Sequence, residues 1–217
     1  MLDFIIYADD TTISSIISTF GRNQNQININ LNEELNKVIF WLKVNKLSLN
    51  INKTKYMIFY PHQKKPSKPQ IVLDNCEIEC VDEFNFLGIT FDKHMNWKSH
   101  INKIANKLSR YIGILNKLKR ILPLNIKLTL YNSLIKPHII YGILLWGHNC
   151  ERILKLQKKI IRIITLSKYN AHTDPIFKSL NILKVCDTFL LHQLKFYYNH
   201  INDKLTQYFQ TLCNNSE

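Results

Sequence analysis

The sequence predicts an α+β protein, because its two parts differ in hydrophobic period. Before residue 95, short runs of apolar and β-branched residues are separated by turn-forming residues, which is typical of β-strands. From Trp97 onward, apolar residues recur at about every 3.5 positions, as in amphipathic helices. With 217 residues, 46% hydrophobic and 21% charged, the chain is long enough for one substantial core or two small ones.

The first predicted element is a hairpin over residues 4–13. An apolar run precedes a turn that carries Asp9 and Asp10, and β-branched residues follow it. Adjacent carboxylates repel each other, so they need water or a divalent cation around them. Because Asp is also a favoured turn residue, the pair by itself leaves two interpretations open, a solvated turn and a metal site.

A helix and several short strands follow the hairpin. Apolar residues at helical spacing predict a helix over residues 31–45, and a strand over 55–60 ends at Pro61. Three further strands are expected over residues 71–73, 77–81 and 84–91. In the last of them, Gly88 would let the backbone approach a partner strand or a ligand closely.

A long basic helix is predicted from Trp97 to the turn before Pro123, and a second helix from 124 to 136, ended by Pro137. The basic residues off the apolar stripe of the first helix are Lys98, Lys103, Lys107, Arg110, Lys117 and Arg120. Lysines on a rigid face release counterions when they meet phosphates, which favours a nucleic-acid surface. The alternative is the ordinary solvated face of a helical bundle.

The segments after Pro137 predict further helices without any assignable chemistry. The most apolar run, over residues 139–147, precedes an amphipathic basic helix over 153–166. Helices over 176–183 and 188–200 follow. Three aromatic residues of the last helix have two interpretations, core packing or stacking surfaces for bases; they are Phe196, Tyr197 and Tyr198.

Charge points to a polyanionic partner. The chain has 29 Lys and Arg against 16 Asp and Glu, a formal net charge of +13. Nucleic acid is the leading candidate, although a basic surface can also reflect solubility or an AT-rich coding sequence.

Five cysteines at irregular spacing follow no secretory signal, so we expect reduced cysteines and an intracellular protein, in nucleus or cytoplasm. A zinc site from Cys76, Cys80, His94 and His100 is an alternative that the strand-like alternation between the cysteines disfavours. The longest apolar run is far shorter than the ~20 residues of a membrane span, so no membrane partner is expected.

Three segments resemble reverse transcriptases. Tyr-Ala-Asp-Asp at residues 7–10, between two apolar strands and followed by Thr-Thr-Ile, resembles the catalytic hairpin of non-LTR retrotransposons of the jockey type. Residues 41–59 resemble a later palm motif of these polymerases, and residues 84–91 resemble the strand that grips the primer. The resemblance implies a partial right-hand polymerase palm over 1–95, built of antiparallel strands with a helix, then a helical thumb over 96–136 and a C-terminal helical module over 137–217.

The same resemblance implies the site residues and partners. Asp9 and Asp10 would be catalytic and hold Mg²⁺, with Mn²⁺ as an alternative, and Lys53 would lie near the triphosphate of the incoming nucleotide. Partners would be an RNA template, a DNA primer and deoxynucleoside triphosphates. Nucleic acid would contact Tyr7, Gly88, Lys98, Lys103, Lys107 and Arg110. No oligomeric state is predicted.

The segments that precede the hairpin in this family do not fit in the eight residues before Asp9. They include the fingers and a further metal-binding aspartate, without which a metal pair would be under-coordinated. We therefore expect no polymerisation by this chain alone. The alternative function is a non-catalytic nucleic-acid-binding relic or domesticated protein that uses the basic thumb.

Overall fold

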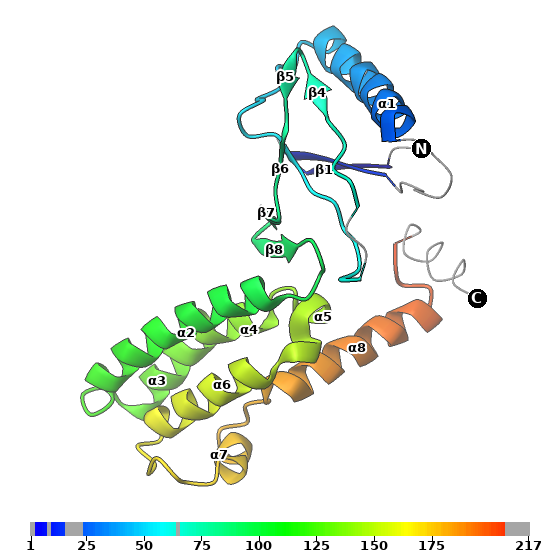
Figure 1. Cartoon of the computed structure of the whole chain (residues 1–217). Coiled ribbons are helices and arrows are strands. Elements are labelled where there is room, and N and C mark those ends of the chain that lie inside the picture. The colour runs from blue at the N-terminus through cyan, green and yellow to red at the C-terminus, as the bar shows by residue number, and fades with distance from the viewer. Residues whose placement is uncertain (1–2, 8–9, 16–23, 64–65, 207–217) are drawn as a thin grey trace. The chain divides into compact units, whose positions relative to one another are not determined.

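The chain forms two compact units. The structure, a computed structural model, describes residues 3–7, 10–15, 24–63 and 66–206. Unit 1 comprises the chain up to Phe84 together with Asp92–Met95, and unit 2 comprises Asn85–Phe91 and the chain from Asn96 onward. Unit 1 combines strands with one helix, whereas unit 2 is largely helical (Figure 1). This mixture agrees with the predicted α+β class, and the division at residues 95 and 136 stays a prediction.

The predicted N-terminal hairpin is confirmed. β1 (Asp3–Tyr7) and β2 (Asp10–Ser14) pair antiparallel, from Asp3 opposite Ser14 to Tyr7 opposite Asp10. Asp9 lies outside the described residues, as do the side chains of Tyr7 and Asp10.

One helix organises the small core of unit 1. α1 (Gln24–Val44) begins earlier than predicted and ends close to the predicted position. Its Ile39 is buried with Leu73 and Ile78. Asn32 ties the helix to the strands, because its amide donates to the Gln70 carbonyl (3.0 Å) and its oxygen accepts from the Val72 N–H (3.0 Å).

The central strands are shorter than predicted, and one pair is parallel. β3 (Lys55–Tyr56) pairs parallel with β6 (Glu79–Cys80), which corrects the expected antiparallel palm strands, and β4 (Val72–Leu73) pairs antiparallel with β5 (Cys76–Glu77). The strand expected over 55–60 ends after Tyr56, and farther along the Tyr60 N–H donates to the Lys93 carbonyl. Each of these strands is two residues long, because its backbone pairs with the neighbouring strand over two residues only.

The single strand predicted over residues 84–91 is wrong, because the chain turns back on itself there. β7 (Glu83–Phe86) and β8 (Ile89–Asp92) pair across a two-residue turn. Leu87 and Gly88 both have positive φ, +47° and +80°. Two successive residues with positive φ are typical of the tight hairpin turn that matches strand twist.

The helices of unit 2 begin with α2 (Lys98–Leu118), as predicted, and α3 (Leu124–Leu130) follows Pro123. The expected helix end at Pro137 is wrong: a π-helical turn, Tyr131–Ile135, leads into α4 (Lys136–Ile140). Pro137 has no N–H to donate to a helical carbonyl. The chain accommodates this residue with a wider turn, in which the Lys136 N–H donates to the Tyr131 carbonyl.

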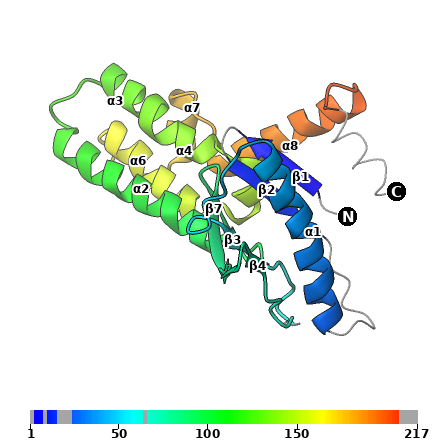
Figure 2. The ribbon, with the colours of Figure 1, turned by 90° about the horizontal axis from the view of Figure 1, so that it is seen from above.

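The remaining elements are α5 (Ile143–Trp146), a 3₁₀ turn (Gly147–Asn149), α6 (Glu151–Ile164), α7 (Asp174–Ser179) and α8 (Val185–Ile201). α2 lies along α6, with α3 and α4 beside them, in both views of the ribbon (Figures 1 and 2). Leu108, Trp146 and Ile160 are fully buried in the shared core.

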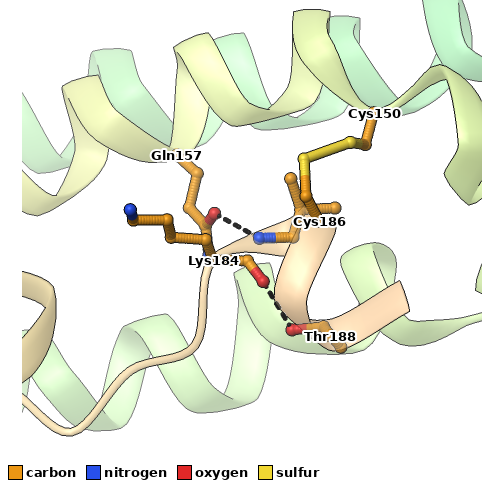
Figure 3. The surroundings of a disulfide bond; sticks show 6 residues. Cys150, Gln157, Lys184, Cys186 and Thr188 are labelled. Atoms are coloured by element: carbon orange, nitrogen blue, oxygen red, sulfur yellow. Dashed lines mark hydrogen bonds between the residues drawn. A yellow bond between two sulfur atoms is a disulfide. The ribbon is translucent and has the colours of Figure 1, made fainter. Parts of the chain in front are cut away.

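A disulfide and a buried amide fasten the start of α8 (Figure 3). The structure pairs Cys150 with Cys186, which corrects the expectation that the cysteines are reduced. Gln157 of α6 is buried, and its oxygen accepts from the Val185 N–H at 2.9 Å. Its amide donates to the Tyr131 hydroxyl and the Leu183 carbonyl, both at 2.9 Å, so every one of these buried polar groups is paired.

Within the described part of the chain, no helix is both long and apolar enough to cross a bilayer.

Candidate functional site

The structure describes the two paired strands of the predicted catalytic hairpin, but not its two carboxylate side chains. Tyr7 ends β1 and lies opposite Asp10, the first residue of β2. The roles of Tyr7, Asp9 and Asp10 therefore stay predictions. Two carboxylates offer the hard oxygen donors that Mg²⁺ prefers. Among the described residues, no three or more His, Cys, Asp or Glu side chains gather to complete such a site.

Lys53 lies in a turn after α1. Its N–H donates to the carbonyl of Asn50 at 3.1 Å, and the Thr54 hydroxyl donates to the same carbonyl at 2.9 Å. These local bonds fix the backbone of the turn and leave the Lys53 side chain exposed. The fold thus presents this ammonium group to solvent, and its predicted role beside a triphosphate stays a prediction.

The zinc alternative finds no support among the described residues. Cys76 is exposed and Cys80 half-buried, and the His94 ring nitrogen Nδ1 lies 2.9 Å from the Tyr60 carbonyl. Cys80 instead adjoins Tyr56, whose hydroxyl donates to the Pro69 carbonyl at 2.6 Å. Burial, with smaller effects from Cys80 and Glu77, raises the pKa of Tyr56 to about 12.

The predicted basic face of α2 is exposed. Lys103, Lys107 and Arg110 stand at helical spacing i, i+4 and i+7, so they form one stripe opposite the buried Ile101 and Leu108. We call these three residues the α2 stripe. Lys98 lies in the first turn on another face, where its N–H donates to Asn96 Oδ1 at 2.9 Å. The four predicted nucleic-acid contacts of this helix are thus divided between two faces.

The α2 stripe is joined to β8. The Thr90 N–H donates to His100 Nδ1 at 3.2 Å, and Lys103 Nζ donates to the Thr90 hydroxyl at 3.0 Å. His100 is buried, and burial, with Lys103 and Lys107 nearby, lowers its pKa. The neutral ring can accept from Thr90 at Nδ1, whereas a protonated ring could not.

The Leu87–Gly88 turn rests on Tyr141. The Tyr141 hydroxyl donates to the Leu87 carbonyl. A methyl group placed on Gly88 would lie 3.5 Å from the Tyr141 ring, and the positive φ of Gly88 would strain any side chain there. Gly88 is exposed and lies beside the Tyr141 ring. Its predicted contact with nucleic acid stays a prediction.

A second contact joins α2 to α4. The rings of Tyr111 and His138 are stacked, and the Tyr111 hydroxyl lies 3.3 Å from His138 Nε2. Burial lowers the pKa of His138, and Lys107 adds to the effect. The α2 stripe therefore acts electrostatically on α4 as well as on His100.

Sequence reasoning missed one signal here. Between Asp92 and Glu151 the chain contains no Asp or Glu at all. This acid-free stretch includes the α2 stripe, the π-helical turn and Lys136, which is exposed at the start of α4. A run of this length without carboxylates concentrates positive charge in this part of the sequence, where, among the described residues, Lys93 at its start is the residue that pairs with a carboxylate, Asp82 (2.6 Å). It can be found without a structure.

Comparison with known proteins gives three relatives, all from Drosophila melanogaster. They are the probable RNA-directed DNA polymerase from transposon X-element (22% identical over 165 residues, 72% of this chain), that from transposon BS (26% over 174 residues, 76%) and the RNA-directed DNA polymerase from mobile element jockey (26% over 197 residues, 83%). The chain spans 18–20% of the length of these relatives. No family model and no solved structure matches it. The resemblance seen in the sequence is confirmed.

Proposed function

We propose that this chain, similar to RNA-directed DNA polymerases of mobile elements, is the palm end and thumb of a reverse transcriptase. The observation that carries the proposal is the Tyr-Ala-Asp-Asp sequence on a paired β-hairpin, in a chain that resembles three such polymerases over 72–83% of its length. In this proposal unit 1 belongs to the palm and α2 to the thumb. The right-hand assignment rests on the order of these segments.

Asp9 and Asp10 would hold Mg²⁺ or Mn²⁺ in the complete enzyme. Two such ions would activate the primer 3′-hydroxyl and stabilise the leaving pyrophosphate. The chain's own contribution would be the paired hairpin in which the Tyr-Ala-Asp-Asp sequence occurs and the exposed ammonium group of Lys53. Two carboxylates by themselves would leave such a metal pair under-coordinated, so we propose that this chain alone does not extend a primer.

Nucleic-acid binding without synthesis is the second candidate function. The exposed α2 stripe and the acid-free stretch around it favour this function, because both serve phosphate binding and neither needs a metal. Binding would be independent of sequence and sensitive to salt.

Primer extension and binding, measured on the same preparations, test the proposal. The substrates are an RNA template annealed to a fluorescent DNA primer, with deoxynucleoside triphosphates and Mg²⁺. The variants are Asp9→Asn, Lys107→Gln and, as a matched control, Asp203→Asn, which removes an exposed carboxylate of unit 2. We expect binding that weakens as salt rises and no extension by the chain alone. Lys107→Gln should weaken binding and lower the salt dependence by about one phosphate contact.

The outcomes separate the two functions. Extension that Asp9→Asn abolishes and Asp203→Asn preserves would make the chain an active polymerase and refute the proposed inactivity. Binding that survives Asp9→Asn, without extension, supports the non-catalytic function. If the chain does not bind primer and template even at low salt, the proposed role of the α2 stripe is wrong.

A further inference from the structure

One motif of unit 2 has a structural explanation for its two glycines and its tryptophan. It reads Tyr141-Gly142-x-x-x-Trp146-Gly147. Gly142 has a φ of +62°, and a methyl group there would collide with Ile89 at 2.4 Å; at Gly147 it would collide with Phe189, also at 2.4 Å. Trp146 is fully buried and donates its Nε1–H to the Tyr141 carbonyl at 3.0 Å.

Tyr141 differs from the rest of the motif because its side chain is 55% exposed. Its hydroxyl is held by the Leu87 carbonyl, and the neighbouring glycine and Trp146 fix its backbone. An aromatic ring that is fixed in position and exposed to solvent loses little conformational freedom on binding. This is the arrangement that a stacking platform for a nucleobase requires.

The ring borders a depression of about 550 Å³, lined by Asn132, Lys136, Pro137, Ile140 and Tyr141. Its wall is mainly apolar, from the proline ring, Ile140 and Tyr141. Lys136 and Asn132 are also lining residues, and their side chains carry a positive charge and an amide that can both donate and accept. The π-helical turn that passes the chain around Pro137 brings these residues to one side, since Asn132 and Lys136 lie within or beside it.

The surroundings favour a phosphate-bearing partner over a protein. The depression lies within the acid-free stretch between Asp92 and Glu151. Tyr141 joins it to the Leu87–Gly88 turn. The lack of carboxylates in this stretch of the sequence favours an anionic partner for the depression.

We infer that this depression binds one unpaired nucleotide of a single-stranded nucleic acid, with its base stacked on Tyr141 and its phosphate paired with Lys136. The inference rests on the proposed function, because it assumes that the α2 stripe holds the same strand. Asn132 would contact the edge of the base, and the apolar wall would exclude water from its far side.

Fluorescence anisotropy with the full chain tests this site. The probes are a fluorescent single-stranded RNA of mixed sequence and an abasic strand of equal length and charge. Tyr141→Leu keeps the apolar bulk and removes the ring, Tyr141→Phe keeps the ring and removes the bond to Leu87, and Tyr169→Leu is the matched control. Tyr169 is 89% exposed in the same unit and contributes to no site described above.

We expect Tyr141→Leu to weaken binding of the RNA about tenfold. Binding of the abasic strand should be unchanged, because only the phosphates of that strand contribute. Tyr141→Phe should stay within about twofold of the wild type, and Tyr169→Leu should match it. Circular dichroism and the unfolding midpoint verify that each variant is folded.

Five results would overturn the inference. If Tyr141→Leu binds the RNA like the wild type while binding stays salt-sensitive, the base site is wrong and the proposed function stands. An equal loss on both strands, or an equal loss in Tyr141→Phe, would make Tyr141 a support for the hairpin turn only. If Tyr141→Leu changes only the molar mass by light scattering, the surface binds another copy of the chain. A wild type that binds neither strand refutes this site together with the proposed binding function.

Discussion

Units 1 and 2 are similar in the share of apolar residues but differ in what they bury. In unit 1 three residues form the described core, and Phe40, Trp41 and Val44 of α1 are more than half exposed. In unit 2 the helices enclose a continuous core that includes the fully buried Trp146 and Ile160. Helices bury a stripe against each other once they form, whereas two-residue strands offer little surface to pack. Stability should therefore reside mainly in unit 2.

Trp146 and Trp41 provide the largest expected contrast. Trp146→Ala should lower the free energy of unfolding by about 3–5 kcal/mol, because it empties a buried site and removes the bond to the Tyr141 carbonyl. Trp41→Ala, at a side chain 53% exposed, should change it by no more than about 0.5 kcal/mol. Chemical denaturation followed by circular dichroism measures both. Equal losses would show that the outer face of α1 is covered in solution.

The cysteines give the next contrast. Cys150→Ser should cost about 3–4 kcal/mol under oxidising conditions, since the disulfide closes a loop across 36 residues. Cys76→Ser should have no measurable effect, because Cys76 is free and exposed. Reductant should lower the unfolding midpoint of the wild type and leave that of Cys150→Ser unchanged. If thiol labelling of the native, unreduced chain modifies both Cys150 and Cys186, the disulfide does not form.

Buried hydrogen bonds should also matter more in unit 2. Gln157→Leu should cost about 2 kcal/mol, because it leaves the Val185 N–H and the Leu183 carbonyl without their partner. Tyr56→Phe removes the bond to the Pro69 carbonyl and should cost about 1 kcal/mol in unit 1. The same denaturation experiment compares them. A larger loss for Tyr56→Phe would reverse the assignment of stability between the units.

The smallest effect is a pH dependence. The pKa of His100 is lowered from its ordinary value of 6.5, so between 6.5 and the lower native pKa the unfolded chain binds more protons than the native chain. Stability is therefore full above that window and falls as the pH decreases through it. His100→Gln, whose oxygen can still accept from the Thr90 N–H, should flatten this slope in urea titrations at successive pH values. Part of the slope should remain, because the pKa of His138 is lowered too.

The sequence predicted the long helices better than the turns that connect the elements, for a physical reason. The apolar stripe of α2 and the break at Pro123 follow from neighbours three and four residues apart. The strand predicted over 84–91 failed at Leu87, because positive φ at a leucine is not readable from its apolar character. The helix end expected at Pro137 failed because a π-helical turn absorbed the missing donor.

The candidate site was predicted in the same uneven way. Lys103, Lys107 and Arg110 could be placed on one exposed stripe from spacing alone, and the structure places them so. Their connection to Thr90 and His138 could not be predicted, since it depends on how α2 packs against β8 and α4. The depression beside Tyr141 was missed altogether, because its lining residues are brought together by a turn that no local pattern specifies.

The sequence by itself determined the helical periods, the hairpin that carries Tyr-Ala-Asp-Asp, the basic stripe of α2 and the resemblance to reverse transcriptases, because each is a local pattern. Only the tertiary structure decided which short strands pair, which cysteines meet, what Gln157 bonds and where Tyr141 is exposed. Those features depend on contacts between residues far apart in the chain, and such contacts are selected by the packing of the whole unit rather than by any segment of it.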